Sequence, residues 1–211
     1  MLDATLTLAL PPRVTAMTGV DAMVHAIEAY TSRHKKNPVS DSLALKALEL
    51  LSCSILTAVQ NGQDLDARRA MLQGSLLAGM AFANSPVGAV HALAYPLGGQ
   101  FHVPHGLSNA LVLAPVLEFN LPAASAHYAD LRRTLPPWLT EAKPQGAEGF
   151  VEALKTLVAA MPMEARLADV GVAPADVPAL ARDAMNVQRL LVNNPREVGY
   201  DDCVRIYESV L

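Results

Sequence analysis

VGAVHALAYPLGGQFHVPHGL, residues 87–107, carries three of the six histidines of this chain, His91, His102 and His105. The Pro-Leu-Gly-Gly break at residues 96–99 predicts that a short helix carrying His91 ends near this point. A second helix is expected to begin just before His105, which then lies in its first turn. The positive end of the helix dipole disfavours imidazolium there, so we expect the neutral imidazole that binds metal ions.

Asp21 and His25 lie four residues apart in a second motif, GVDAMVHAIEAY. The apolar pattern around them predicts a helix over residues 13–32, and residues i and i+4 of a helix share one face. One carboxylate together with imidazoles suits a borderline divalent ion such as iron or zinc. We therefore predict that Asp21, His25, His91 and His105 bind one divalent metal ion.

Each of these four residues also has a structural interpretation. Asp21 could cap a helix or form a local salt bridge, and His25 could be a core histidine with a hydrogen-bond partner. His91 and His105 could be solvated side chains beside proline and glycine. The joint prediction requires a long-range contact, which spacing along the chain does not determine.

Composition narrows the class of protein. The chain has 211 residues, of which 52% are hydrophobic and 17% charged, and its net charge is −4. The negative charge argues against a nucleic-acid partner, and no uncharged apolar run of about 18 residues indicates a membrane span. The apolar excess predicts a helical core and an exposed interface, hence a homo-oligomer. Cys53, expected to be buried, and Cys203 are isolated, which together with the lack of a signal peptide predicts a reducing cytoplasmic location.

Residues 1–10 alternate between apolar and other side chains, and Pro11 and Pro12 end this pattern. A period of two predicts a strand or an extended linker. The remaining patterns are helical, so the sequence predicts an all-α, multi-helix bundle-like domain with a short extended N-terminal segment.

Several helices have boundaries that the sequence indicates. Thr18, Ser40 and Asp64 are predicted N-caps, and the helix from Ser40, apolar on all sides, is expected to be central. The other predicted helices cover residues 64–83, 87–96, 104–120, 122–134, 147–160, 174–185 and 202–211.

The segment MTGVDAMVHAIEAYTS, followed by HALAYPLGGQFHVPHGLSNALVL, resembles the iron-containing (group III) alcohol dehydrogenases, and the resemblance covers essentially the whole chain. It implies the dehydroquinate synthase-like helical half of that superfamily. The family's metal ligands are one aspartate and three histidines, and the matching positions are Asp21, His25, His91 and His105. The implied cofactor is Fe²⁺, or Zn²⁺, and the full set of histidines favours iron.

The chain departs from the family pattern in two respects. Family members begin with a nucleotide-binding domain that holds NAD(P), and we expect residues 1–12 to be a remnant strand or linker to this absent domain. Residues 13–211 are then the helical metal-binding domain. Many members also carry a histidine where Tyr95 stands, and a phenol is a poor base at neutral pH. Tyr95 or His102 is therefore expected nearest the proton path.

The resemblance implies NAD(P)-linked oxidation of a small alcohol or reduction of a carbonyl compound, with the metal as Lewis acid. We expect this chain to bind metal but to be inactive without the nucleotide-binding domain. Phe82 and Phe101 are candidates for lining a substrate pocket, although core packing is the preferred interpretation. The alternative function is a non-catalytic helical metal-binding or dimerisation module from a truncated chain. A metal hydrolase is less favoured, since four protein ligands leave less room for an activated water.

Overall fold

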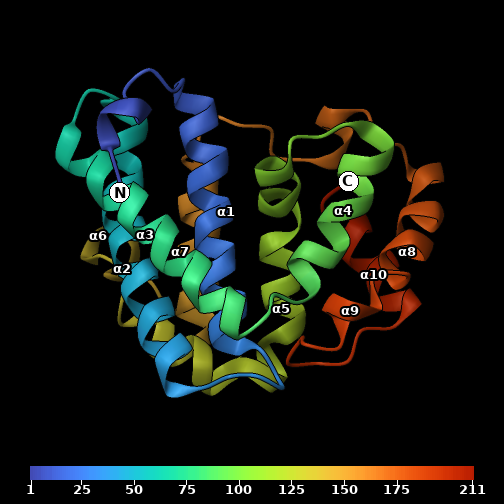
Figure 1. Cartoon of the computed structure of the whole chain (residues 1–211). Coiled ribbons are helices and arrows are strands. Elements are labelled where there is room, and N and C mark those ends of the chain that lie inside the picture. The colour runs from blue at the N-terminus through green and yellow to red at the C-terminus, as the bar shows by residue number, and fades with distance from the viewer.

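The computed structural model describes residues 1–211, and all of its regular secondary structure is helical. The prediction of an all-α fold is confirmed (Figure 1). The α-helices are α1 (Pro12–Thr31), α2 (Pro38–Gln60), α3 (Leu65–Asn84), α4 (Ala89–Phe101), α5 (His105–Arg132), α6 (Pro137–Thr140), α7 (Gly146–Ala159), α8 (Val177–Met185), α9 (Gln188–Leu191) and α10 (Tyr200–Glu208). Three 3₁₀ helices are η1 (Ala4–Thr7), η2 (Leu167–Val170) and η3 (Pro174–Asp176).

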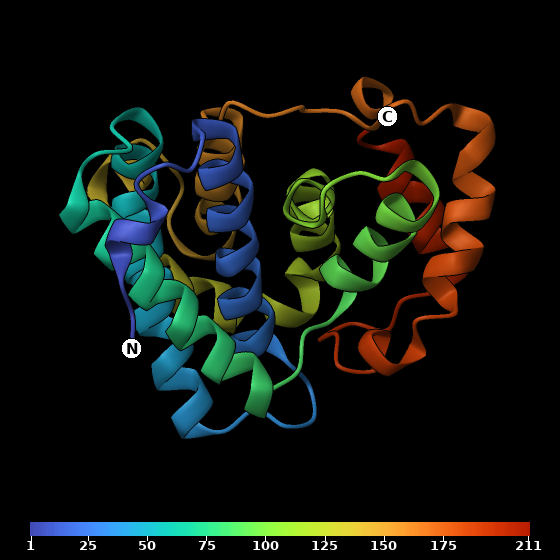
Figure 2. The same cartoon turned by 45° about the horizontal axis from the view of Figure 1, so that its top comes forward.

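The central helix is α1, whereas the sequence predicted α2. Fourteen of the 20 residues of α1 are buried, against nine of the 23 residues of α2. Helix α1 packs against α2 and α3 on one side and against α5 on the other, as Figure 2 shows. The prediction was wrong because an apolar outer face does not by itself place a helix in the core. The central position of α1 lets its side chains meet those of α4 and α5.

The N-terminal segment is not a strand. Residues Ala4–Thr7 form η1, and the Asp3 carboxylate accepts hydrogen bonds from the Thr5 amide at 3.0 Å and the Thr5 hydroxyl at 2.6 Å. The Thr7 hydroxyl donates to the Ala4 carbonyl at 2.8 Å. Short polar side chains offer the backbone local partners, and here these bonds favour a turn over the extended chain that alternation predicted.

Helix starts agree with the sequence at Asp64, which caps α3, but not at Thr18 or Ser40. Thr18 lies inside α1, where its hydroxyl donates to the Val14 carbonyl at 2.9 Å. The N-cap of α2 is Asn37, and Ser40 completes its capping box from the third helical position. Pro12 and Pro38 occupy the first helical positions of α1 and α2. The missing proline N–H costs nothing there, because the first amides of a helix have no intrahelical acceptor.

Two predicted helix breaks at proline are absent. Helix α4 continues through Pro96 to Phe101, and α5 runs through Pro115 and Pro122. An interior proline costs on the order of 3 kcal/mol in a helix because it removes a hydrogen bond and clashes with the preceding turn. Pro96 and Pro115 are buried, as are Leu97 and Val116 after them, and this packing overrides the local preference. Pro122, in contrast, is exposed.

Helices α2 and α5 are long and apolar enough to cross a membrane by length and composition, although charged residues interrupt the apolar run of each. Within the apolar window, 67% of α5 and 44% of α2 is buried inside the fold. Helix α5 therefore uses most of its apolar residues in the protein core, whereas α2 presents much of its surface outward. Cys53, which lies on α2, is exposed rather than buried as predicted.

Candidate metal centre

Three helices bring the four predicted ligands to one place. Helix α1 supplies Asp21 and His25, α4 supplies His91 and α5 supplies His105, and one ligand atom from each lies within 4.8 Å of the others. Because Asp21 and His25 are one helical turn apart, their side chains project from the same face of α1. His91 and His105 reach this face only because α4 and α5 pack beside each other and α5 packs on α1.

The distances suit a small cation. The Nε2 atoms of His91 and His105 lie 3.7 and 3.6 Å from Asp21 Oδ1. Metal–nitrogen and metal–oxygen bonds of about 2.0–2.2 Å require donor atoms only slightly closer together than this. Three imidazoles and one carboxylate are also the donor types that iron and zinc accept. The residues present therefore fit a borderline divalent metal ion.

His25 is held as a neutral imidazole. Its ring stacks between Phe82, with centroids 4.5 Å apart, and His91, with centroids 4.6 Å apart. Burial lowers the pKa of His25 to about 4, while the Asp21 carboxylate opposes this shift and His91 adds to it. A neutral imidazole at pH 7 keeps the lone pair that binds a metal. Phe82 thus packs against a candidate ligand.

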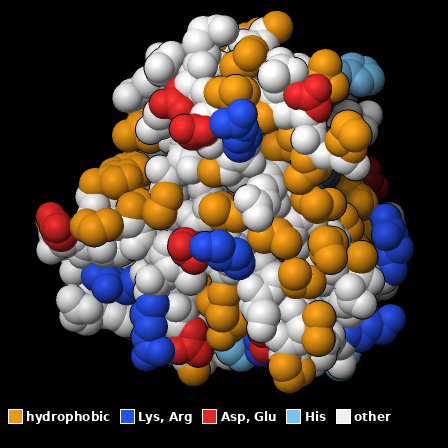
Figure 3. All heavy atoms as spheres, turned by 60° about the vertical axis from the view of Figure 1, so that its left-hand side comes forward, with side chains coloured by type: hydrophobic (Ala, Val, Ile, Leu, Met, Phe, Trp, Pro, Cys, Tyr) orange, Lys and Arg blue, Asp and Glu red, His pale blue; other side chains and the backbone are white.

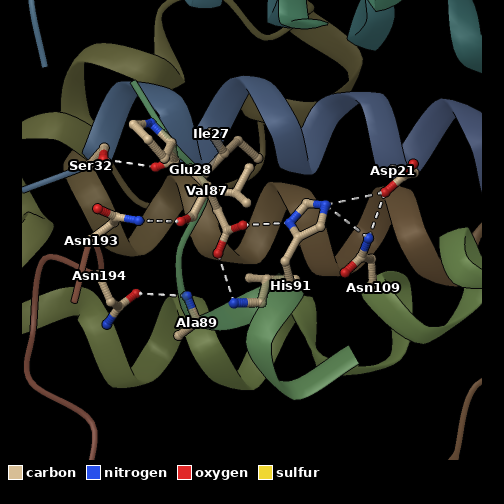
Figure 4. Close-up of polar contacts among 12 residues, drawn as sticks. Asp21, Ile27, Glu28, Ser32, Val87, Ala89, His91, Asn109, Asn193 and Asn194 are labelled. Carbon is tan, nitrogen blue, oxygen red and sulfur yellow. Dashed lines mark hydrogen bonds and ion pairs between the residues drawn. The ribbon is translucent and has the colours of Figure 1, made fainter. Parts of the chain in front are cut away.

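Glu28 is part of the site and was not identified from the sequence. Its Oε2 lies 2.6 Å from His91 Nδ1, and its Oε1 accepts the Val90 amide at 2.7 Å (Figure 4). The carboxylate holds the proton on Nδ1, which leaves the Nε2 lone pair of His91 facing Asp21. The available signal was spacing: Glu28 follows His25 by three residues and so shares its helix face.

Asn109 is the second residue that sequence reasoning missed. It follows His105 by four residues on α5, and its Nδ2 donates to Asp21 Oδ1 at 2.5 Å. The same nitrogen lies 3.3 Å from His91 Nε2 and 3.2 Å from His105 Nε2. The i to i+4 spacing from a predicted ligand could have identified it.

Of the two predicted catalytic residues, Tyr95 lies beside the ligand cluster and His102 lies outside it. The Tyr95 ring, 38% exposed, is 6.0 Å from the His105 ring, and the Arg189 guanidinium lies 5.7 Å from the Tyr95 ring. His102 caps the end of α4 in the left-handed conformation, with φ 56°, and is not among the clustered ligands. Phe101 is half-buried against the core. The structure thus brings Tyr95, but not His102, beside the site.

A buried amide network positions the start of α4. The Asn193 side chain donates to the Val87 carbonyl at 3.1 Å, and Asn194 Oδ1 accepts from the Ala89 amide at 3.4 Å (Figure 4). Asn194 Oδ1 also accepts from the Asn120 side chain at 3.0 Å. These bonds hold the segment that leads into His91.

Gly106 sets the approach of α5 to α1. A Cβ atom at this position would lie 2.4 Å from the Met17 carbonyl oxygen, which no side chain tolerates. His105 precedes Gly106 directly, so the close approach also fixes where His105 meets Asp21.

We expect Gly106→Ala to displace the start of α5 and weaken both folding and metal binding. Overpacking of this kind costs about 1–3 kcal/mol of unfolding free energy. The matched control is Gly99→Ala in α4, where an added Cβ meets nothing within 4 Å. Denaturant unfolding and zinc titration of both variants provide the measurement. Equal behaviour of the two variants contradicts this account of Gly106.

Known proteins that resemble this chain in sequence are iron-containing alcohol dehydrogenases. A sequence model of the Fe-containing alcohol dehydrogenase family, C-terminal region, matches residues 15–211. Long-chain-alcohol dehydrogenase 1 of Geobacillus thermodenitrificans is 42% identical over 212 residues, covering 99% of this chain and 53% of that protein.

Solved structures share the same helical arrangement. The alcohol dehydrogenase from Oenococcus oeni has a TM-score of 0.91 at 37% identity, covering 99% of this chain and 54% of that one. Sulfoacetaldehyde reductase from Bifidobacterium kashiwanohense, solved in complex with NAD⁺, has a TM-score of 0.86 at 27% identity, with 99% and 53% covered. The chain spans about half the length of the curated relatives it matches.

Proposed function

Since this chain belongs to the iron-containing alcohol dehydrogenase family, we propose that it is the metal-binding half of an NAD(P)-linked alcohol or aldehyde oxidoreductase. Residues 13–211 form the metal-binding domain, and residues 1–12 link it to a nucleotide-binding domain. The observation that carries the proposal is the convergence of Asp21 with three imidazoles from three helices.

In this proposal, Asp21, His25, His91 and His105 hold Fe²⁺ or Zn²⁺. The bound ion supplies Lewis-acid chemistry, which lowers the pKa of an alcohol oxygen. Asp21 is the one charged ligand, and its hydrogen bond from Asn109 orients its carboxylate.

Substrate reaches the site from the side of His105. The His105 side chain is 48% exposed, whereas that of His91 is 3% exposed. Tyr95 stands at this open side, where its hydroxyl can donate a hydrogen bond to a substrate oxygen or to water. Burial of His91 and Glu28 excludes water from the opposite side of the ligand set.

The proposed cofactor set is the cation plus NAD(P), with the dinucleotide held by the nucleotide-binding domain. One solved relative carries NAD⁺, and the curated relatives include a long-chain-alcohol dehydrogenase and 1,3-propanediol dehydrogenase. A small alcohol or carbonyl compound is therefore the proposed substrate class. The net charge of −4 argues against a nucleic-acid partner, and the two unpaired cysteines support a cytoplasmic location.

The purified 211-residue chain tests this proposal. Elemental analysis is expected to find one iron or zinc ion per chain, and alcohol with NAD⁺ or NADP⁺ is expected to yield no reduced nucleotide. Addition of a nucleotide-binding domain from a relative is expected to restore turnover. Steady reduction of NAD⁺ or NADP⁺ by this chain alone contradicts the proposal that a separate domain must hold the dinucleotide. Absence of bound metal contradicts the proposed metal site.

One surface supports the alternative of a helical metal-binding and dimerisation module. A groove of about 520 Å³ lies between η1 and α3, and six of its ten lining residues are hydrophobic, among them Leu2, Leu65 and Leu76. Figure 3 shows many hydrophobic side chains on the side of the molecule that lies to the left in Figure 1. Self-association through such a surface gives a homo-oligomer. Light scattering decides this point, since a monomer at all concentrations excludes the dimerisation module.

A further inference from the structure

One exposed arginine lies at the open side of the proposed metal site. Arg189 belongs to α9, which packs against α4 and contributes the buried Leu190 and Leu191 to the core. The guanidinium carbon of Arg189 lies 5.7 Å from the centre of the Tyr95 ring, within the range of a cation–π contact. The Tyr95 ring in turn lies 6.0 Å from the ring of His105, the exposed member of the ligand set.

The positive charge of Arg189 has no acidic partner in this chain. Its guanidinium forms no ion pair and donates no hydrogen bond, and only its backbone carbonyl takes part in one, accepting from Asn193 Nδ2 at 3.1 Å. Asp183, the acidic residue nearest to Arg189 along the sequence, has its Oδ2 2.5 Å from Gln100 Nε2. The N–H groups of the Arg189 guanidinium are therefore free to bind an anion, and a carboxylate matches two of them at once.

The spacing of these groups sets the length of a molecule that can reach both the metal ion and Arg189. The two ring distances, together with metal–nitrogen bonds of about 2.1 Å, place the guanidinium within about 15 Å of an ion bound to His105. A chain of about four to six carbon atoms, with an oxygen on the ion and a carboxylate paired with the guanidinium, covers a distance of this order.

We propose that Arg189 makes this site selective for alcohols or aldehydes that carry a carboxylate, or another negatively charged group, at the far end of the molecule. Tyr95 lies between the two positive groups, where its ring can pack along the carbon chain of the substrate. A neutral alcohol leaves the guanidinium hydrated and gains nothing from it, so the selectivity comes from the added charge pair. The inference deepens the proposed function and rests on it, since the substrate oxygen has to bind the metal ion.

Thiols with a second functional group are suitable probes, because a thiolate binds zinc or cobalt(II) at the position of the substrate oxygen. On cobalt, a bound thiolate gives a charge-transfer absorption that reports occupancy without nucleotide or turnover. The charged probes are 4-mercaptobutanoate and 6-mercaptohexanoate, and their neutral counterparts are 4-mercaptobutan-1-ol and 6-mercaptohexan-1-ol. The two members of each pair differ only at the end that is expected to meet Arg189.

In the cobalt-loaded wild-type chain, at least one mercapto acid is expected to bind roughly three- to tenfold more tightly than the mercapto alcohol of the same length. Arg189→Met keeps an unbranched side chain without the charge, and is expected to abolish this preference while the mercapto alcohols bind as before. The matched control is Arg69→Met, which removes an exposed arginine of α3 that pairs with Asp66 at 2.8 Å. This control is expected to keep the preference.

Two results overturn this inference while the proposed metal site stands. One is equal binding of the acid and alcohol probes by the wild-type chain at both lengths. The other is a preference for the acids that survives in Arg189→Met, since the charge of the metal ion then accounts for it. Bound cobalt that accepts no thiol overturns the inference together with the proposed access from the side of His105. Failure of the wild-type chain to bind cobalt overturns the metal site itself.

Discussion

His91→Ala is expected to lower the zinc or iron affinity of this chain by at least about a hundredfold. Zinc binding to a four-ligand protein site contributes on the order of 10–16 kcal/mol, so one ligand corresponds to about 3 kcal/mol. The His91 ring is buried, and Glu28 fixes its orientation through Nδ1. No exposed side chain or bulk water can therefore easily take the place of His91 in the ligand set. Isothermal titration calorimetry with zinc measures the effect.

The control for His91→Ala is His34→Ala, which removes an exposed histidine that lies outside the ligand cluster. This variant is expected to bind zinc as the wild-type chain does. His91→Ala also leaves the Glu28 carboxylate buried without its partner, so its unfolding free energy must be measured without metal. A folded His91→Ala protein that binds zinc with unchanged affinity removes His91 from the site.

Glu28→Gln is expected to weaken metal binding roughly 10- to 100-fold, the usual effect of losing an outer partner of a metal ligand. The glutamine oxygen can still accept the Val90 amide, but its NH₂ group then faces His91 Nδ1. His91 has to accept at Nδ1, which moves its proton to Nε2. The nitrogen that faces Asp21 then has no lone pair for a cation.

Imidazole ¹⁵N chemical shifts measure this effect directly, because they distinguish the two neutral tautomers of His91. Calorimetry with zinc gives the affinity. The matched control is Glu49→Gln, which alters a half-exposed carboxylate paired with Lys46 on α2 and is expected to change neither. An Nδ1-protonated His91 in Glu28→Gln contradicts the role assigned to the Glu28 carboxylate.

Features within one helix followed from the sequence because they depend on short-range geometry. The spacing of Asp21 and His25 placed them on one face, and Asp64 marked the start of α3. The predictions that were wrong failed because tertiary packing, or a more favourable capping residue nearby, determined the helix boundary. Pro96 was expected to end a helix, yet its burial keeps α4 intact. Ser40 was expected to cap α2, but Asn37 and a proline supply that start.

The sequence by itself therefore determined the helical class, the family resemblance and the four candidate ligands. Only the tertiary structure decided that Glu28 holds His91, that Asn109 lies among the ligand atoms and that α1 rather than α2 is central. The physical reason is the range of the interactions. Spacing and capping act within about one helical turn, whereas these contacts join residues that approach only when α1, α4 and α5 pack together.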